Sequence, residues 1–463
     1  MSGGPSLTGT APHRGYRPLV AIGSRLAGVQ LAQVALTTTD LVMMGRLGVG
    51  AVAAGGLAAL LYNQVRTMCV GVVTPVGNLV AGVLGRHEAA GTGEDGDQER
   101  DDEVRAVVRA AFAVATVTGV VAAAVVVGLG LVLPWFGQSP SVVATALPMM
   151  AALAPGLVPM LWLQVLRQYA VGMHRAGSLL GVTIASIGVN IVLNGCFVYG
   201  WFGVPVIGVT GIGLATALVQ LLSFLAYLVI VTRDPSLTPA LSLRGWRAEG
   251  PRVREIVRLG TPASLTYASE AGITTVATIV MGIFGPVALA AHNVVNNITY
   301  IVYQVSIGIS QGASILVSRS VGRGDDTEPR RVAERAFVLS AGLQVVLAGV
   351  YLLAPHAVLA LFLGDDDAAV YGTATTLLVL AIVQQVTKGG QNIAVGLMRG
   401  LGDTKVGFRA SLLGYWGVGV PAMLLCAWVL GWSGPGVWVG MCLGFGATGV
   451  LVLRRFAVRT RGA

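Results

Sequence analysis

The chain repeats part of its own sequence. Residues 45–85 can be laid over residues 282–322 without a gap, at a constant offset of 237 residues that carries Gly45 onto Gly282. Both copies are apolar and rich in glycine and alanine, and each ends in a basic, polar loop. An internal repeat in a hydrophobic chain is typical of membrane transporters, in which the binding site lies between two similar halves.

The length of the apolar runs indicates the fold class. Charged residues make up 11% of the 463 residues and apolar residues 54%, whereas about a quarter of an ordinary globular protein is charged. A helix needs roughly 20 apolar residues to cross a bilayer, and runs of this length exclude a β-barrel. We predict an all-α integral membrane protein with about twelve transmembrane helices in two pseudo-symmetric six-helix lobes. The predicted helices lie near residues 19–44, 50–84, 106–134, 142–171, 178–201, 207–232, 256–283, 287–320, 333–362, 370–398, 406–430 and 434–454.

The loops between these helices predict the orientation in the membrane. Basic residues gather in every second loop and at both ends of the chain, whereas the opposite loops carry Arg46 and the acidic run Asp365–Asp367. Basic loops stay in the cytoplasm, so we expect a multi-pass protein of the plasma membrane with both termini cytoplasmic. The stretch Glu94–Glu103 is expected to be a cytoplasmic loop. The predicted domains are a cytoplasmic tail at 1–17, an amino lobe at 18–233, a cytoplasmic linker at 234–254, a carboxyl lobe at 255–455 and a cytoplasmic tail at 456–463.

Several function classes are not expected. A net charge of +9 could suggest nucleic acid, but the basic residues lie where membrane topology explains them. The four cysteines have no metal-ligand spacing, and no nucleotide-binding or serine-hydrolase motif occurs. We therefore expect no enzyme, no nucleic-acid partner and no cofactor, and any active transport would draw on a proton or sodium gradient. The expected partners are the lipid bilayer and a small organic substrate, and we expect a monomer.

Asp40 is the sharpest candidate of the amino half, because a carboxylate at membrane depth is costly and is usually kept for a function. In the predicted fifth helix Asn190 and Asn194 lie one turn apart, so both amides project from one face. Thr216 adds a hydroxyl from the sixth helix. These groups could join Asp40 around a hard cation, with sodium as the possible metal, or could adjust its protonation. The alternatives are that Asp40 reaches the membrane surface and that the amides only join helices.

The carboxyl half carries a second acid, Glu270. The repeat offset places Glu270 on Gln33, whereas Asp40 falls on Ala277, so the two carboxylates are not repeat mates. Each half therefore has a polar group at the same helical level. Further residues that could line a cavity are Gln33, Arg66, Arg167 and Tyr267.

The predicted tenth helix carries a lysine at membrane depth. Gln384, Lys388 and Gln391 lie on one face of this helix, at spacings of i, i+4 and i+7. A buried lysine is costly unless it is paired, and Glu270 is the nearest acid by topology. We expect an ion pair between Glu270 and Lys388; the alternative is that Lys388 meets substrate while Glu270 binds a cation.

Five short motifs occur along the chain: Asp40–Gly45, Leu193–Gly200, Gly208–Thr216, Arg258–Pro262 and Met398–Lys405. In this order and spacing they resemble the multidrug and toxic-compound extrusion (MATE) transporters, most closely their bacterial multidrug branch. The resemblance runs from about Arg17 to Arg455 and implies two lobes arranged as a V, with organic compounds exported against protons or sodium by rocking between inward-open and outward-open states. It also implies that Asp40, Asn190, Asn194 and Thr216 form a cation site and that Glu270 is an acid of the carboxyl lobe.

The sequence departs from this family at Lys388, where bacterial members often carry a carboxylate. A fixed ammonium would occupy the place of a mobile cation, so the coupling would rest on the amino lobe. Two alternatives to an ion-coupled exporter are a lipid-linked precursor flippase of the related superfamily and a membrane scaffold or sensor without transport. The substrate stays open, because Asp40 and Glu270 favour cations whereas Arg66, Arg167 and Lys388 could admit neutral or acidic compounds.

Overall fold

The computed structural model describes residues 15–91, 94–136, 138–175, 177, 179–363 and 368–461. Within these residues all regular secondary structure is helical, and the predicted all-α fold class is confirmed. Most of the predicted tail 1–17, the acidic run Asp365–Asp367 and residues 462 and 463 of the predicted carboxyl tail lie outside the described residues.

Six helical segments form the amino lobe. Two of them are interrupted at prolines, which lack the N–H that a continuous helix would use: the second segment at Thr74 and Pro75, and the fourth at a 3₁₀ turn over Ala154–Gly156. The helices are α1 (Arg17–Gly45), α2 (Val49–Val73), α3 (Val76–Ala90), α4 (Glu94–Val132), α5 (Pro140–Leu153), α6 (Leu157–Gly172), α7 (Leu179–Tyr199) and α8 (Val209–Arg233).

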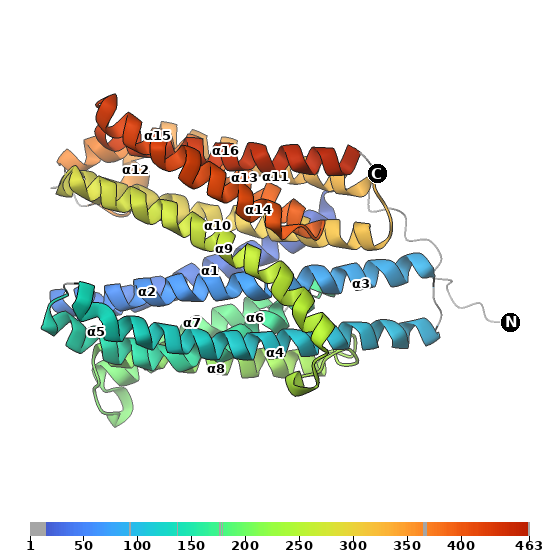
Figure 1. Ribbon diagram of the computed structural model, residues 1–463. Coiled ribbons are helices and arrows are strands. Elements are labelled where there is room, and N and C mark those ends of the chain that lie inside the picture. The colour runs from blue at the N-terminus through green and yellow to red at the C-terminus, as the bar shows by residue number, and fades with distance from the viewer. Residues whose placement is uncertain are drawn as a thin grey trace.

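Six further segments form the carboxyl lobe, and α9 crosses from the level of the first lobe to the second (Figure 1). The fifth of these segments alternates between α-helical and π-helical turns. The elements are α9 (Gly250–Ile283), α10 (Pro286–Gly322), α11 (Glu328–Leu353), α12 (Pro355–Leu359), α13 (Ala368–Gly400), α14 (Thr404–Ser411), the π-helix Leu412–Gly419, α15 (Val420–Leu424), the π-helix Leu425–Val429 and α16 (Ser433–Arg461).

Eleven helical segments within the described residues are long and apolar enough to cross a membrane. α9 is not among them, although its 34 residues suffice in length. Arg252, Arg254 and Glu255 at its start, and Glu270 with several hydroxyl residues in its middle, lower its hydropathy. With α9, each of the twelve predicted apolar runs corresponds to one helical segment.

The prediction of a loop at Glu94–Glu103 is wrong, because these residues are the first turns of α4. Acidic residues are favourable at a helix amino terminus, where the peptide dipoles leave partial positive charge. One-turn ion pairs add to this stability: Arg100 lies 2.6 Å from Asp97, and Arg105 pairs with Asp102. Polarity alone therefore did not distinguish a loop from a helix that extends beyond the bilayer.

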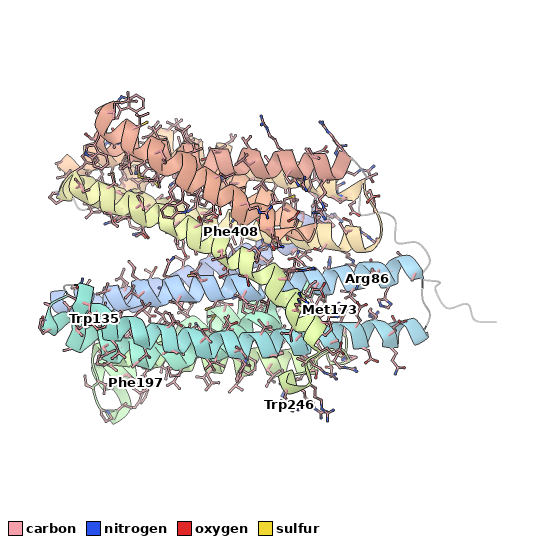
Figure 2. All side chains as sticks on the ribbon, viewed as in Figure 1. Arg86, Trp135, Met173, Phe197, Trp246 and Phe408 are labelled. Carbon is pink, nitrogen blue, oxygen red and sulfur yellow. The ribbon has the colours of Figure 1, made fainter. Side chains whose placement is uncertain are left out.

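Hydrophobic packing follows the two lobes. One cluster of buried side chains lies mainly in the amino lobe and includes Leu161. Two further clusters lie mainly in the carboxyl lobe, around Trp438 and Val317, and the second of these also takes in Leu19 of α1. Exposed aromatic residues mark the two ends of the bundle: Trp135, 87% exposed, lies at the end opposite the last turn of α16, and Trp246, 81% exposed, lies toward the other end (Figure 2). Aromatic residues are enriched at both surfaces of a membrane.

Glycines of the internal repeat bring the two lobes into contact. A Cβ at Gly71 of α2 would lie 2.5 Å from Ser264 Cα of α9, and a Cβ at its repeat mate, Gly308 of α10, would lie 2.6 Å from the nitrogen of Ala27 in α1. Such glycines let membrane helices approach closely. A second pair of repeat mates, Gly85 and Gly322, meets where α3 crosses α10, near the end of the bundle where α16 ends (Figure 1). Equivalent glycines of the two repeat copies therefore lie at the contacts between the lobes.

Candidate ion and substrate site

Asp40, near the carboxyl end of α1, is held by three side chains of two other helices. Asn190 and Asn194 of α7 donate from their Nδ2 atoms to Asp40 Oδ1 at 3.1 and 2.8 Å, and Thr216 of α8 donates from Oγ1 to Oδ2 at 3.1 Å. Both asparagines are fully buried. The structure therefore brings the four sequence-predicted residues together, with the carboxylate directed into the lobe rather than toward the membrane surface.

One acceptor of this cluster, the side-chain oxygen of Asn194, has no donor within the described part of the chain. Asn194 donates to Asn190 Oδ1 at 3.1 Å, but Asn194 Oδ1 is buried without a hydrogen-bond partner among the described residues. A buried carbonyl oxygen without a donor is unusual. Together with a carboxylate it fits a sodium ion, which prefers oxygen ligands, and the carboxylate alone fits a proton.

A cavity of about 630 Å³ opens beside this cluster. Its walls include Asp40 and Thr216 of the amino lobe and Tyr300 and Phe362 of the carboxyl lobe, so the cavity lies between the lobes. Arg66 and Arg167 line it as well.

A second cavity of about 470 Å³ adjoins the first and shares part of its wall. The sequence-predicted cavity residues Gln33, Arg66, Arg167 and Tyr267 all line this second cavity. Its other charged residues are Glu270, Lys388 and Arg399. The two adjoining cavities therefore connect the Asp40 cluster of the amino lobe to the charged residues of the carboxyl lobe.

Glu270 and Lys388 face each other across the second cavity's wall. Lys388 Nζ lies 3.5 Å from Glu270 Oε1, and the two side chains are 12% and 13% exposed. The same ammonium lies 4.2 Å from the centre of the Tyr303 ring, a distance at which the ring's quadrupole attracts a cation. The ion pair expected from topology is present, and it leaves Glu270 with a tethered counter-ion.

Gln384 and Gln391 do not line the second cavity, although Lys388 of the same helix does. Both are buried, and neither belongs to the cavity wall; Gln384 Nε2 lies 3.9 Å from Met441 Sδ instead. α10 and α16 both pack against α13 and cover these parts of it. Asn392 lines the cavity and donates to the Tyr303 hydroxyl at 2.8 Å.

Other residues of the cavity wall were not predicted from the sequence, although a signal for them was present. Tyr303 is the repeat mate of Arg66, and Tyr300 is the repeat mate of Asn63; all four line the second cavity. The offset that placed Glu270 on Gln33 would have found them. The two halves therefore contribute side chains to the cavity wall from equivalent repeat positions, but the residue types at these positions differ.

A model of the MatE family matches residues 26–195 and 262–425, two segments that contain Asp40, Asn190, Asn194, Glu270 and Lys388. The protein described as probable multidrug resistance protein NorM of Pseudomonas aeruginosa is 36% identical over 448 residues, which cover 96% of this chain and 89% of that protein. The chain belongs to the MatE family. The resemblance drawn from the five motifs is confirmed, and the chain is a multi-pass membrane protein of the MATE multidrug efflux transporters.

Solved MATE structures share the fold of this chain. A structure described as the outward-facing conformation of a MATE family multidrug resistance transporter superposes with a TM-score of 0.85 at 19% identity, covering 97% of each chain. The eukaryotic MATE transporter AtDTX14 superposes with a TM-score of 0.81 at 18% identity, covering 95% of each chain. The two-lobed arrangement of twelve transmembrane helices in this MATE protein is therefore confirmed.

Proposed function

We propose that this MATE protein is a secondary active antiporter that exports organic compounds in exchange for protons or sodium by alternating access. The observation that carries the proposal is the Asp40 carboxylate, held by Asn190, Asn194 and Thr216 at the edge of a cavity between the lobes. A carboxylate changes the charge of its surroundings when a proton or sodium binds, as exchange requires.

α1 connects this carboxylate to the other lobe. Asp40 lies near one end of α1, and the same helix packs against α10, with Gly23 and Ala27 close to Gly308. A change in the bonds of Asp40 therefore acts on a helix that belongs to the contact between the lobes. This contact supports a coupling of ion occupancy to the relative position of the two lobes.

Ion pairs join the lobes near the end of the bundle where α16 ends (Figure 1). Arg319 of α10 donates from Nε to Glu88 of α3 at 3.0 Å, and Arg252 of α9 lies 2.8 Å from Glu103 of α4. Arg86, labelled at this end in Figure 2, also pairs with Glu103, at 2.6 Å. We propose that this end is cytoplasmic and that these contacts close the cytoplasmic face in this state.

Reconstituted vesicles test the function. Purified protein in proteoliposomes should move a fluorescent organic compound against its concentration gradient when a proton or sodium gradient is imposed, and not when the gradient is collapsed by an ionophore. Equal uptake with and without the ion gradient would contradict antiport. Separate proton and sodium gradients identify the coupling ion.

Cysteine labelling tests the orientation of a monomer proposed to lie in the plasma membrane. Ser139, an exposed residue beside α5, is expected on the outer side, and Ala463, outside the described residues, on the cytoplasmic side. A cysteine at Ser139 should react with an impermeant maleimide on intact cells, and a cysteine at Ala463 should react only after permeabilisation. The unmodified chain, whose four cysteines are free, supplies the background; the reverse pattern would contradict the basic-loop argument.

A further inference from the structure

The second cavity carries more positive than negative charge. Arg66, Arg167, Lys388 and Arg399 line it, and Glu270 is its one acidic side chain among the described residues. Lys388 lies 3.5 Å from Glu270, so these two charges compensate each other. The three arginines remain.

The three arginines have no acidic partner among the residues that the structure describes. None of the three guanidinium groups forms an ion pair with a carboxylate in the described part of the chain. Arg66 Nε is buried without a hydrogen-bond partner, and its Nη1 reaches Asn63 Oδ1 only at 3.4 Å. Arg167 is 9% exposed. Arg399 donates to neutral groups, at 3.0 Å to the Tyr267 hydroxyl and at 3.5 Å to Ser314 Oγ.

Asp40 does not remove this excess. It lines the adjoining cavity together with Arg66 and Arg167, but its oxygens accept from Asn190, Asn194 and Thr216. Even with Asp40 ionised, one carboxylate faces two arginines in that cavity, so the positive charge is in excess before any coupling ion binds.

A buried arginine without a counter-charge is costly, and an anionic ligand supplies the missing partner. The guanidinium fork matches the two oxygens of a carboxylate or sulfonate. Amide side chains and Tyr300 surround the arginines, and an apolar or aromatic body of a ligand can lie against such a ring. The cavity volume of about 470 Å³ is in the range of sites for small organic ligands.

We propose that the second cavity binds an amphipathic organic anion, with the ligand's carboxylate or sulfonate on Arg66 and Arg167. The proposal rests on the proposed function, since it names the substrate class of the same site. It assigns Lys388 to the neutralisation of Glu270, which would otherwise repel such a ligand.

Two dyes with the same ring system and opposite charge provide the test. Carboxyfluorescein and rhodamine 123 are both xanthenes, the first an anion and the second a cation at neutral pH. We expect purified protein to bind carboxyfluorescein at least about tenfold more tightly than rhodamine 123, measured by fluorescence anisotropy in detergent. Arg167→Gln and Arg66→Gln should each weaken carboxyfluorescein binding by about ten- to a hundredfold, and should leave rhodamine binding unchanged or tighter.

Two further variants separate charge from folding. Arg46→Gln makes the same charge change at an exposed position outside both cavities and should leave both affinities unchanged. Arg167→Lys keeps the charge without the fork and should restore part of the carboxyfluorescein affinity. Tighter binding of rhodamine by the unmodified protein, binding of neither dye, or an equal loss of both dyes in Arg167→Gln and Arg66→Gln would overturn the proposal.

Binding without an ion gradient distinguishes this proposal from the proposed function. If carboxyfluorescein binds selectively but no imposed gradient drives its transport, antiport fails and the anion site stands. If rhodamine 123 is transported under a gradient and carboxyfluorescein is neither bound nor transported, antiport stands and the anion site fails.

Discussion

Asp40→Asn should reduce gradient-driven efflux to the background of vesicles without protein, while the protein stays folded and inserted. The amide cannot lose or gain a charge when an ion arrives, so the exchange has no step at which ion binding changes the site. The fold should tolerate the substitution, because Thr216 Oγ1, which now donates to Asp40 Oδ2, can instead accept from an amide. Efflux of a fluorescent substrate from proteoliposomes, at matched protein amounts, is the measurement.

A control with the same chemical change is available on the surface. Asp97 is an exposed residue of α4 that pairs with Arg100, and such a surface pair contributes little. Asp97→Asn should therefore transport as the unmodified protein does. Efflux above background in Asp40→Asn would exclude Asp40 as the coupling group. If the variant loses both substrate binding and efflux, the defect is in folding.

Glu270→Gln and Lys388→Met should each destabilise the protein in detergent by about 3–5 kcal/mol, because each leaves a largely buried charge without its partner. The double variant should lose less than the sum of the single variants, since it leaves neither charge uncompensated. Chemical or thermal unfolding of all four proteins under one condition gives the coupling energy between the two side chains.

The exposed pair of Arg459 and Asp403, at 2.8 Å, is the reference for this cycle. Its arginine side chain is 46% exposed, so Asp403→Asn should cost less than about 1 kcal/mol. Strictly additive losses in the Glu270 and Lys388 cycle would show that the two charges do not stabilise each other.

The fold could be predicted from the sequence because the membrane leaves a chain few choices. Backbone groups in lipid must pair within a helix, so every apolar run became a helical segment. The prediction failed at Glu94–Glu103, where the polar composition is equally compatible with a loop and with a helix that extends into water. The backbone of the structure shows that α4 begins at Glu94, and one-turn ion pairs stabilise these first turns.

The site was predicted where helical spacing alone decides which side chains meet. Asn190 and Asn194, one turn apart, both reach Asp40. The same reasoning grouped Gln384 and Gln391 with Lys388, but a helix face can be covered by one neighbour and open to a cavity a turn away. Which turn is open depends on how α10 and α16 pack on α13, and this packing is not encoded in the spacing of one helix.

The tethered ammonium of Lys388 has a consequence for the work that the membrane potential can do. With Glu270 already neutralised, the proposed exchange carries one ion inward at Asp40 in each cycle. For a neutral substrate, 100 mV supplies about 2.3 kcal/mol per charge moved, or less than about a hundredfold concentration ratio. An anionic substrate leaving an inside-negative cell adds a second charge in the favourable direction, so the same potential supports a ratio of more than about a thousandfold. In a transporter with a single ion site, the charge of the anionic substrate would thus double the electrical work that the membrane potential does in each cycle.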